Sequence, residues 1–306
     1  ASLLAGAALL TVAGPIVGET IATLPPSFPA GTAGPLEAIG FPHEDVSFPS
    51  TDGLTLRGWF VPAARADAPA IVYAPATAHD QRSGLSLVPA FHRAGYHVLL
   101  FSYRGHALSD GKRDGFTYGH AESRDVDAAV RYLHEVRGVE RVAAVGHSAG
   151  AASAILSAAR NPRVGAVVAV APFTCVADIW YTSRPRLVPA FILDWALWVA
   201  EQRRGFDRAE ICPVEVVDQI APRPLLIIHG AEDTHITEAQ VGRLFDAARA
   251  PKALWLVQGA DHSQVRSPVL DDISGDVIAF LDTAFGVDRG VASAPAYLKK
   301  SAARAQ

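Results

Sequence analysis

The sequence is poor in charge, in cysteine and in methionine. Only 19% of its 306 residues are charged, two are cysteines and none is methionine. The net charge is −4 and no run of basic residues exceeds a pair, which excludes the charge pattern of a nucleic-acid-binding protein. Half of the residues are hydrophobic, which excludes a disordered chain and predicts a large buried core. We therefore expect a folded protein that acts on small or neutral molecules.

The two cysteines and eleven histidines do not form the pattern of a metal site. Two cysteines are too few for a cysteine-built zinc site, and the histidines form no H-E-x-x-H or comparable pair. Cys175 and Cys212 are expected to be buried free thiols, with a single disulfide across the segment between them as the alternative. Residues 105–113 lack the spacing and the Ser or Thr of a phosphate-binding loop, so neither a metal nor a cofactor is predicted.

The first 18 residues carry no charge and are mostly apolar. This length suits a signal-peptide remnant or a short membrane anchor, or else an apolar helix that docks on the folded domain. Residues 24–42 are rich in proline and glycine and are typical of a linker, so residues 1–43 are expected to precede the folded unit. The protein is expected to be membrane-associated or exported if residues 1–18 anchor or direct it, and cytoplasmic otherwise.

Short aliphatic runs alternate with helical stretches from residue 44 onward, which is typical of α/β proteins. Most of the runs are continuously apolar, as expected of parallel strands covered on both faces. A turn signal at Thr51-Asp52-Gly53 predicts that the first two runs pair as an antiparallel hairpin. We predict a mostly parallel, eight-stranded sheet with helices on both faces. The predicted strands are residues 44–48, 54–62, 70–74, 96–103, 142–145, 164–170, 224–229 and 253–257, and the predicted helices are residues 86–94, 120–136, 149–160, 238–249 and 270–284.

One segment interrupts this alternation, because about fifty residues separate the sixth predicted strand from the seventh, far more than a loop and one helix require. We expect residues 174–220 to form a helical cap inserted into a core of residues 44–173 and 221–288, with residues 289–306 as a C-terminal tail. A helix at 187–200 would carry aromatic side chains on one face. We expect them to line a hydrophobic pocket, the alternative being a helix packed into the domain. The pocket candidates are Phe173, Trp180, Phe191, Trp195 and Trp198.

The sequence Gly146-His147-Ser148-Ala149-Gly150 matches the G-x-S-x-G pattern of a nucleophilic serine. A strand is predicted before it and an alanine-rich helix after it, which is the context that the pattern requires. The turn between them is so tight that side chains at the two glycines would clash, and it raises the serine hydroxyl above the sheet. Ser148 is therefore the predicted nucleophile.

A serine hydroxyl needs a base to accept its proton and a carboxylate to orient that base. Asp233 follows the seventh predicted strand and His262 follows the eighth, so both would lie at the same edge of the sheet as Ser148. Serine, acid and histidine occur in the chain order typical of this architecture. Glu232 and Asp261 are alternative acids, and His235 is an alternative base.

Five segments carry a family resemblance: DGLTLRGWFVPA at 52–63, FSYRGHALSDGK at 101–112, GHSAG at 146–150, RPLLIIHGAEDTHIT at 223–237 and LWLVQGADHS at 254–263. Over residues 44–285 the chain resembles the α/β-hydrolase superfamily, and within it the Bem46-like and related esterase or peptidase-like serine hydrolases. The resemblance implies an α/β-hydrolase fold with Ser148 as nucleophile, Asp233 as acid and His262 as base. Many Bem46-like relatives also have an N-terminal membrane segment, which residues 1–18 would match.

The loop after the third predicted strand departs from this family. Relatives usually have His-Gly there, whereas this chain has Ala74-Pro75. Because proline has no N–H, the resemblance implies that the backbone N–H groups of Ala76 and Ala149 form the oxyanion hole. Thr77 is the alternative to Ala76 as the first donor.

The resemblance implies a cofactor-independent serine hydrolase with a catalytic triad. We expect a carboxylesterase that cleaves small-molecule esters with short- to medium-chain acyl groups. Peptidase, thioesterase and acyltransferase activities would use the same triad. A protein that keeps the fold but binds without turnover is the alternative from another class.

Overall fold

The computed structural model describes residues 40–113, 115–184, 188–265, 273–287 and 298–301. Residues 1–18, for which a signal remnant, an anchor or a docked helix was expected, lie outside these ranges. The same is true of nearly all of the predicted linker and of most of the predicted C-terminal tail.

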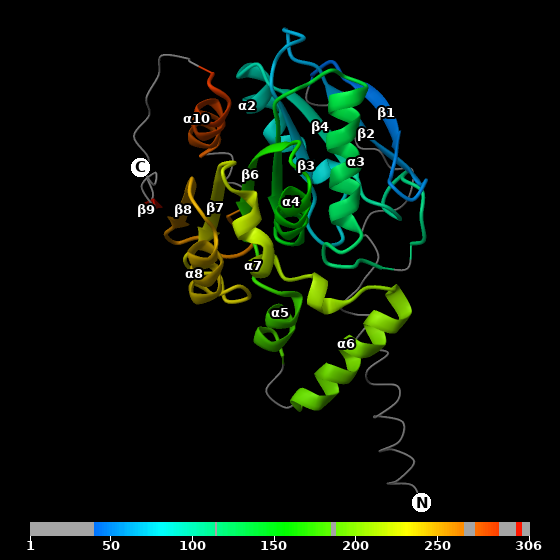
Figure 1. Ribbon diagram of the computed structural model, residues 1–306, viewed down its shortest axis with the longest axis vertical. Helices are drawn as coiled ribbons and strands as arrows, with labels where there is room; N and C mark the ends of the chain where they lie inside the picture. Colours follow the sequence, from blue (N-terminus) through cyan, green and yellow to red (C-terminus); the bar gives the residue numbers. More distant parts are fainter. Residues whose placement is uncertain (1–39, 114, 185–187, 266–272, 288–297, 302–306) are drawn as a thin grey trace, which may run out of the picture.

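The described residues form one sheet, whose strands are β1 (Glu44–Pro49), β2 (Thr55–Val61), β3 (Ala70–Ala74), β4 (His97–Ser102), β5 (Val142–His147), β6 (Val164–Val170), β7 (Leu225–Gly230), β8 (Lys252–Val257) and β9 (Leu298–Ser301). Their order across the sheet is β1-β2-β4-β3-β5-β6-β7-β8-β9 (Figure 1). The strands from β4 to β8 in this order run parallel, whereas β1 and β2 form the expected antiparallel hairpin. The prediction of a mostly parallel sheet is confirmed, and β9 adds a short strand antiparallel to β8.

Helices cover both faces of the sheet, and they are α2 (Val88–Arg93), α3 (Glu122–Glu135), α4 (Ala149–Arg160), α8 (Glu238–Ala247) and α10 (Ser274–Phe285). Successive residues of β5 point to opposite faces. Val142 and Ala144 belong to a core shared with α3, α4 and α8, while Ala143 and Val145 belong to a core shared with α2 and α10. Since both faces are buried, the central strands are apolar along most of their length, and their few polar residues lie at or near the strand ends.

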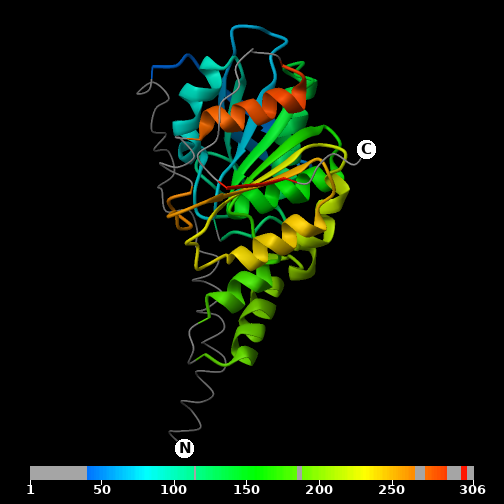
Figure 2. The same cartoon turned by 90° about the vertical axis from the view of Figure 1, so that its left-hand side faces the viewer.

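Between β6 and β7 the chain forms α5 (Val176–Thr182), α6 (Ala190–Arg204), η3 (Arg208–Glu210), α7 (Pro213–Val216) and η4 (Val217–Ile220). We call α5 and α6 the cap helices. They project away from the sheet, beyond the strand ends that lead into α4 and α5 (Figures 1 and 2). Pro189 is the N-cap of α6, and Gly205 ends the helix in a left-handed conformation with φ of 68°. Among the helices in the described ranges, none is both long and apolar enough to span a membrane.

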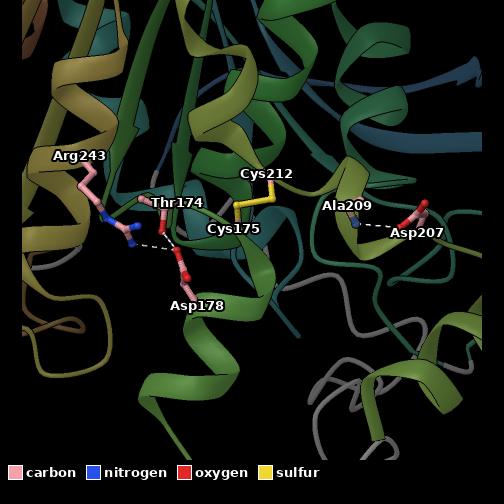
Figure 3. The surroundings of a disulfide bond; sticks show 7 residues. All are labelled: Thr174, Cys175, Asp178, Asp207, Ala209, Cys212 and Arg243. Carbon is pink, nitrogen blue, oxygen red and sulfur yellow. Dashed lines mark hydrogen bonds and ion pairs between the residues drawn. A yellow bond between two sulfur atoms is a disulfide. The ribbon is translucent and has the colours of Figure 1, made fainter. Parts of the chain in front are cut away.

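A disulfide joins the two ends of this inserted segment (Figure 3). Cys175 lies just before α5, and its sulfur is bonded to that of Cys212, which lies just before α7. The incoming and outgoing chain run side by side here, because the Val176 N–H donates to the carbonyl of Ile211 at 3.0 Å. The expectation of two free thiols was wrong. Residues separated by 37 positions become neighbours only after the segment between them has folded back.

Candidate active site

The turn between β5 and α4 holds Ser148 in an unusual backbone conformation. Its φ of 55° and ψ of −120° lie outside the regions favoured by residues with a side chain. A Cβ built on Gly146 would lie 2.3 Å from the carbonyl oxygen of Gly150, and one on Gly150 would lie 2.1 Å from that of Ala74. Glycine is therefore required on both sides of the turn. The turn places the partly exposed Ser148 hydroxyl at the start of α4.

Asp233 lies on the loop that follows β7. Its Oδ1 accepts hydrogen bonds from the backbone N–H groups of His235 at 2.8 Å and Ile236 at 2.9 Å. Its Oδ2 lies 2.6 Å from Nδ1 of His262. Burial raises the pKa of Asp233, but the hydrogen bonds from His262 and the backbone outweigh burial and hold the pKa below its ordinary value. Asp233 is therefore a carboxylate at neutral pH and can orient the imidazole.

His262, on the loop after β8, connects the carboxylate to the serine. Its Nε2 lies 3.1 Å from Oγ of Ser148, while its Nδ1 faces Asp233. Because a carboxylate only accepts hydrogen bonds, Nδ1 carries the proton and Nε2 is left to accept the proton of the hydroxyl. The structure thus brings together the three side chains that the sequence pattern singled out.

The alternative acids and the alternative base lie beside this hydrogen-bonded chain. Glu232 is exposed next to the buried Asp233. Asp261 accepts hydrogen bonds at 2.8 Å from two backbone N–H groups of its own turn. His235 is exposed, with its ring centroid 5.9 Å from that of His262. The positions of these residues therefore favour Asp233 and His262 over them.

Two backbone segments meet beside Ser148. Ala149 is the first residue of α4, so its N–H has no acceptor within the helix. The loop after β3 packs against the start of α4, because carbonyl oxygens of this loop fill the space beside Gly150. Ala76 follows on that loop and is buried. This arrangement suits an oxyanion hole, and the choice of Ala76 over Thr77 stays a prediction.

Two further histidines border the site, and neither was predicted from the sequence. His147 donates its Nε2–H to the backbone carbonyl of His262 at 3.2 Å, and the two ring centroids lie 5.3 Å apart. His229, near the end of β7, is fully buried, and burial lowers its pKa, so it is neutral at pH 7. The sequence signal for His147 was its place next to Ser148 in the G-x-S-x-G pattern. Despite these histidines, the described part of the chain gathers no three side chains that could ligate a metal.

The five predicted pocket residues fall into two groups. Phe173 is buried and Trp180 is half-buried. Phe191, Trp195 and Trp198 instead lie on the exposed side of α6, where they are 63%, 39% and 53% exposed. These three side chains are exposed because α6 buries its opposite side through leucine and alanine residues, and their assignment to a substrate pocket stays a prediction. A helix that is apolar on both sides does not reveal from its periodicity which side faces the protein.

Comparison with known proteins relates the chain to hydrolases and transferases. The family described as serine aminopeptidase, S33 matches residues 77–211. The polyketide transferase grgF of Penicillium sp is 31% identical over 291 residues, which cover 81% of this chain and 96% of that protein. The uncharacterized protein YqkD of Bacillus subtilis is 29% identical over 222 residues, which cover 70% of this chain and 71% of that protein.

Solved structures share the fold. The α/β hydrolase GrgF from Penicillium sp. superposes with a TM-score of 0.65 at 22% identity, covering 80% of this chain and 100% of that one. The Pyrococcus furiosus esterase Pf2001 gives a TM-score of 0.69 at 20% identity, covering 85% of this chain and 99% of that one. At these identities the likeness establishes the common fold alone.

Proposed function

The chain belongs to the α/β-hydrolase superfamily, and from this we propose that it is a serine hydrolase that cleaves esters through an acyl-enzyme on Ser148. The observation that carries the proposal is the hydrogen-bonded chain from Asp233 through His262 to Ser148, with distances of 2.6 and 3.1 Å. A carboxylate, an imidazole and a hydroxyl linked by hydrogen bonds in this way make the hydroxyl nucleophilic at neutral pH. A place within the Bem46-like branch is part of the same proposal.

In the proposed mechanism, Ser148 Oγ attacks the ester carbonyl while its proton passes to Nε2 of His262. The imidazolium that forms is stabilised by the carboxylate of Asp233. The carbonyl oxygen becomes an oxyanion, which accepts hydrogen bonds from the N–H groups of Ala149 and Ala76. His262 then returns the proton to the leaving alcohol as its C–O bond breaks, which leaves the acyl group on Ser148. Water attacks the acyl-enzyme by the same steps and releases the acid.

The proposed substrates are small-molecule esters with short or medium acyl chains. Phe173, three residues after the end of β6, is buried, and Trp180 on α5 is half-buried. These apolar side chains follow the strand next to β5 and are candidates to receive an acyl chain. The mechanism needs three side chains and two backbone N–H groups, and no cofactor takes part in it.

Acyl transfer is the second candidate, because the relative that is 31% identical over 96% of its length is named a polyketide transferase. The same acyl-enzyme would then react with an alcohol, an amine or a thiol in place of water. Peptidase and thioesterase activities would also use this triad, and the matching family is described as serine aminopeptidase. These activities differ in leaving group and acceptor, so product analysis separates them.

Hydrolysis of p-nitrophenyl esters of increasing acyl length tests the proposal in the wild type, in Ser148→Ala and in Ser47→Ala. Ser47 is the matched control because its side chain is exposed on β1. We expect Ser148→Ala to lose at least about 1,000-fold in kcat and to lose labelling by a fluorophosphonate, while Ser47→Ala keeps both. An added primary alcohol would yield a new ester if transfer competes with hydrolysis.

Labelling that survives in Ser148→Ala would place the nucleophile on another residue. A well-folded wild type that hydrolyses no ester, thioester or peptide and takes up no fluorophosphonate would favour the binding protein without turnover.

A further inference from the structure

The cap helices carry most of the large apolar side chains that the described residues expose to solvent. Tyr181 on α5 is 42% exposed, and Phe191, Trp195 and Trp198 on α6 are 63%, 39% and 53% exposed. We call these four side chains the aromatic face. Two other large apolar side chains, Leu108 and Val136, are similarly exposed, and they lie outside the cap helices.

The aromatic face cannot be buried by a simple rotation of α6. Leu193, Ala196, Leu197 and Ala200 are buried on the opposite side of the helix, so turning α6 would only exchange one exposed apolar side for another. The cap helices also project from the end of the molecule, where the sheet and its covering helices do not reach (Figures 1 and 2). An exposed apolar patch on a projecting element is typical of a surface that contacts a partner.

The residue types of the aromatic face favour one partner. Tryptophan and tyrosine are preferred where a membrane meets water, because one part of the ring system is apolar and another donates a hydrogen bond. The Tyr181 hydroxyl already donates to Asp194, and this contact holds α5 against α6. At 15 residues α6 is too short to cross a bilayer. In contact with a membrane it would therefore lie along the interface between lipid and water.

The chain outside the described residues favours the same partner. Residues 1–18 carry no charge, and the 21 residues from 19 to 39 separate them from the folded unit. A chain of that length spans up to roughly 70 Å when extended, so residues 1–18 and the aromatic face can reach one bilayer together. Two weak contacts joined by a linker reinforce each other, because the second contact forms at high effective concentration.

We infer that the aromatic face of the cap helices inserts into the surface of a lipid bilayer. The charges around it predict how selective this contact is. Arg203 and Arg204 lie in the last turn of α6, and Asp194 lies within the face. With charges of both signs present, apolar insertion rather than charge attraction drives the contact, so zwitterionic lipid is sufficient and salt has little effect.

Tryptophan fluorescence of the full chain tests this inference. Of the five tryptophans, Trp59 and Trp255 are buried and Trp180 is half-buried, so the exposed ones are Trp195 and Trp198. We expect phosphatidylcholine vesicles with brominated acyl chains to quench the emission of the wild type. The double variant Trp195→Phe, Trp198→Phe is expected to lose the quenching that the brominated acyl chains cause. The variant should still sediment with the vesicles.

The triple variant Phe191→Ser, Trp195→Ser and Trp198→Ser removes three of the four side chains of the aromatic face and leaves Tyr181, which bonds Asp194, in place. We expect its vesicle partition coefficient to fall about tenfold or more, with an unchanged thermal unfolding midpoint because these side chains are exposed. Val136→Ser is the matched control, since Val136 is 67% exposed but lies next to α3. The control is expected to partition like the wild type.

Equal partitioning of the triple variant and the wild type would overturn the inference and leave residues 1–18 as the sole membrane contact. A dimer that forms without vesicles and is lost in the triple variant would also overturn it, because the aromatic face would then be a contact between two copies of the chain.

Discussion

The edge of the sheet that carries Ser148, Asp233 and His262 and the cap helices are held in place in opposite ways. At the edge, backbone atoms approach so closely at Gly146 and Gly150 that a single Cβ would not fit, and a buried carboxylate orients the histidine. The cap helices instead expose large aromatic side chains to solvent, and one disulfide joins the two ends of the segment that contains them. The edge is therefore suited to holding reacting atoms in position, whereas the cap helices are suited to contacts outside the chain.

Asp233→Asn tests the edge without changing its packing and is expected to have the largest effect. The amide keeps the shape of the carboxylate but no longer stabilises the imidazolium of His262, so we expect kcat to fall by about 1,000- to 10,000-fold. Glu232→Gln is the matched control, because this neighbouring carboxylate is exposed. Steady-state ester hydrolysis measures both variants. A larger loss in the control would assign the acid to Glu232.

The double variant Cys175→Ser, Cys212→Ser tests how much the disulfide at the ends of the inserted segment stabilises the protein. A disulfide that closes a loop of 37 residues stabilises a fold by about 3–4 kcal/mol when it acts by restricting the unfolded chain. We expect the free energy of unfolding in urea to fall by that amount, with little change in kcat for a soluble ester. Wild type treated with a reducing agent is the control. An unchanged free energy of unfolding would mean that packing alone holds the two ends of the inserted segment together.

A pair of glycine substitutions compares the two regions directly. In Gly150→Ala the new Cβ would lie 2.1 Å from the carbonyl oxygen of Ala74, so the loop after β3 must move. In Gly205→Ala the Cβ meets no atom within 4 Å, and the cost is that of the left-handed backbone, about 1 kcal/mol. We expect Gly150→Ala to lose roughly 2–3 kcal/mol of stability together with activity. If urea denaturation shows that Gly150→Ala and Gly205→Ala lose the same free energy of unfolding, the two regions do not differ in how tightly their backbone is packed.

Acid is expected to weaken the sheet rather than the cap, because residues 174–220 contain no histidine. His106 and His229 are buried, and burial lowers the pKa of each. Unfolded histidine takes up a proton near pH 6.5, whereas these two stay neutral to lower pH. Stability is therefore fully present above about pH 6.5 and falls below it, by up to roughly 1.4 kcal/mol per pH unit for each histidine.

Urea midpoints measured at about pH 7, 6 and 5 test this pH dependence. His106→Phe keeps an aromatic ring against Tyr103 and Phe116 and is expected to reduce the slope. A wild-type midpoint that stays constant or rises on acidification would contradict the prediction.

The core strands could be predicted from the sequence because burial on both faces leaves an uninterrupted apolar run. Val164–Val170 is such a run, and its predicted bounds are those of β6. The predicted helix at 187–200 was displaced from α6, since Pro189 occupies the N-cap and the helix continues to Arg204 before Gly205 ends it. β9 was missed because a strand at the edge of a sheet can pair through its backbone without an apolar pattern.

The candidate site divides in the same way. Ser148 follows β5 directly, and Asp233 and His262 lie on the loops that follow β7 and β8. A local pattern and the direction of parallel strands therefore predicted that the three would meet, while their catalytic role stays a prediction. The disulfide and the exposure of Trp195 could not be predicted, because both depend on how a long insertion folds back on itself.

The bond between Cys175 and Cys212 lies where the inserted segment leaves the hydrolase core and returns to it. Ser148 precedes the enclosed segment, and Asp233 and His262 follow it, so none of these three candidate site residues is encoded inside. A change in the length or composition of the segment between the two cysteines therefore leaves the pairing of the strands unaltered. One hydrolase body could in this way acquire new outer surfaces by replacing a single module.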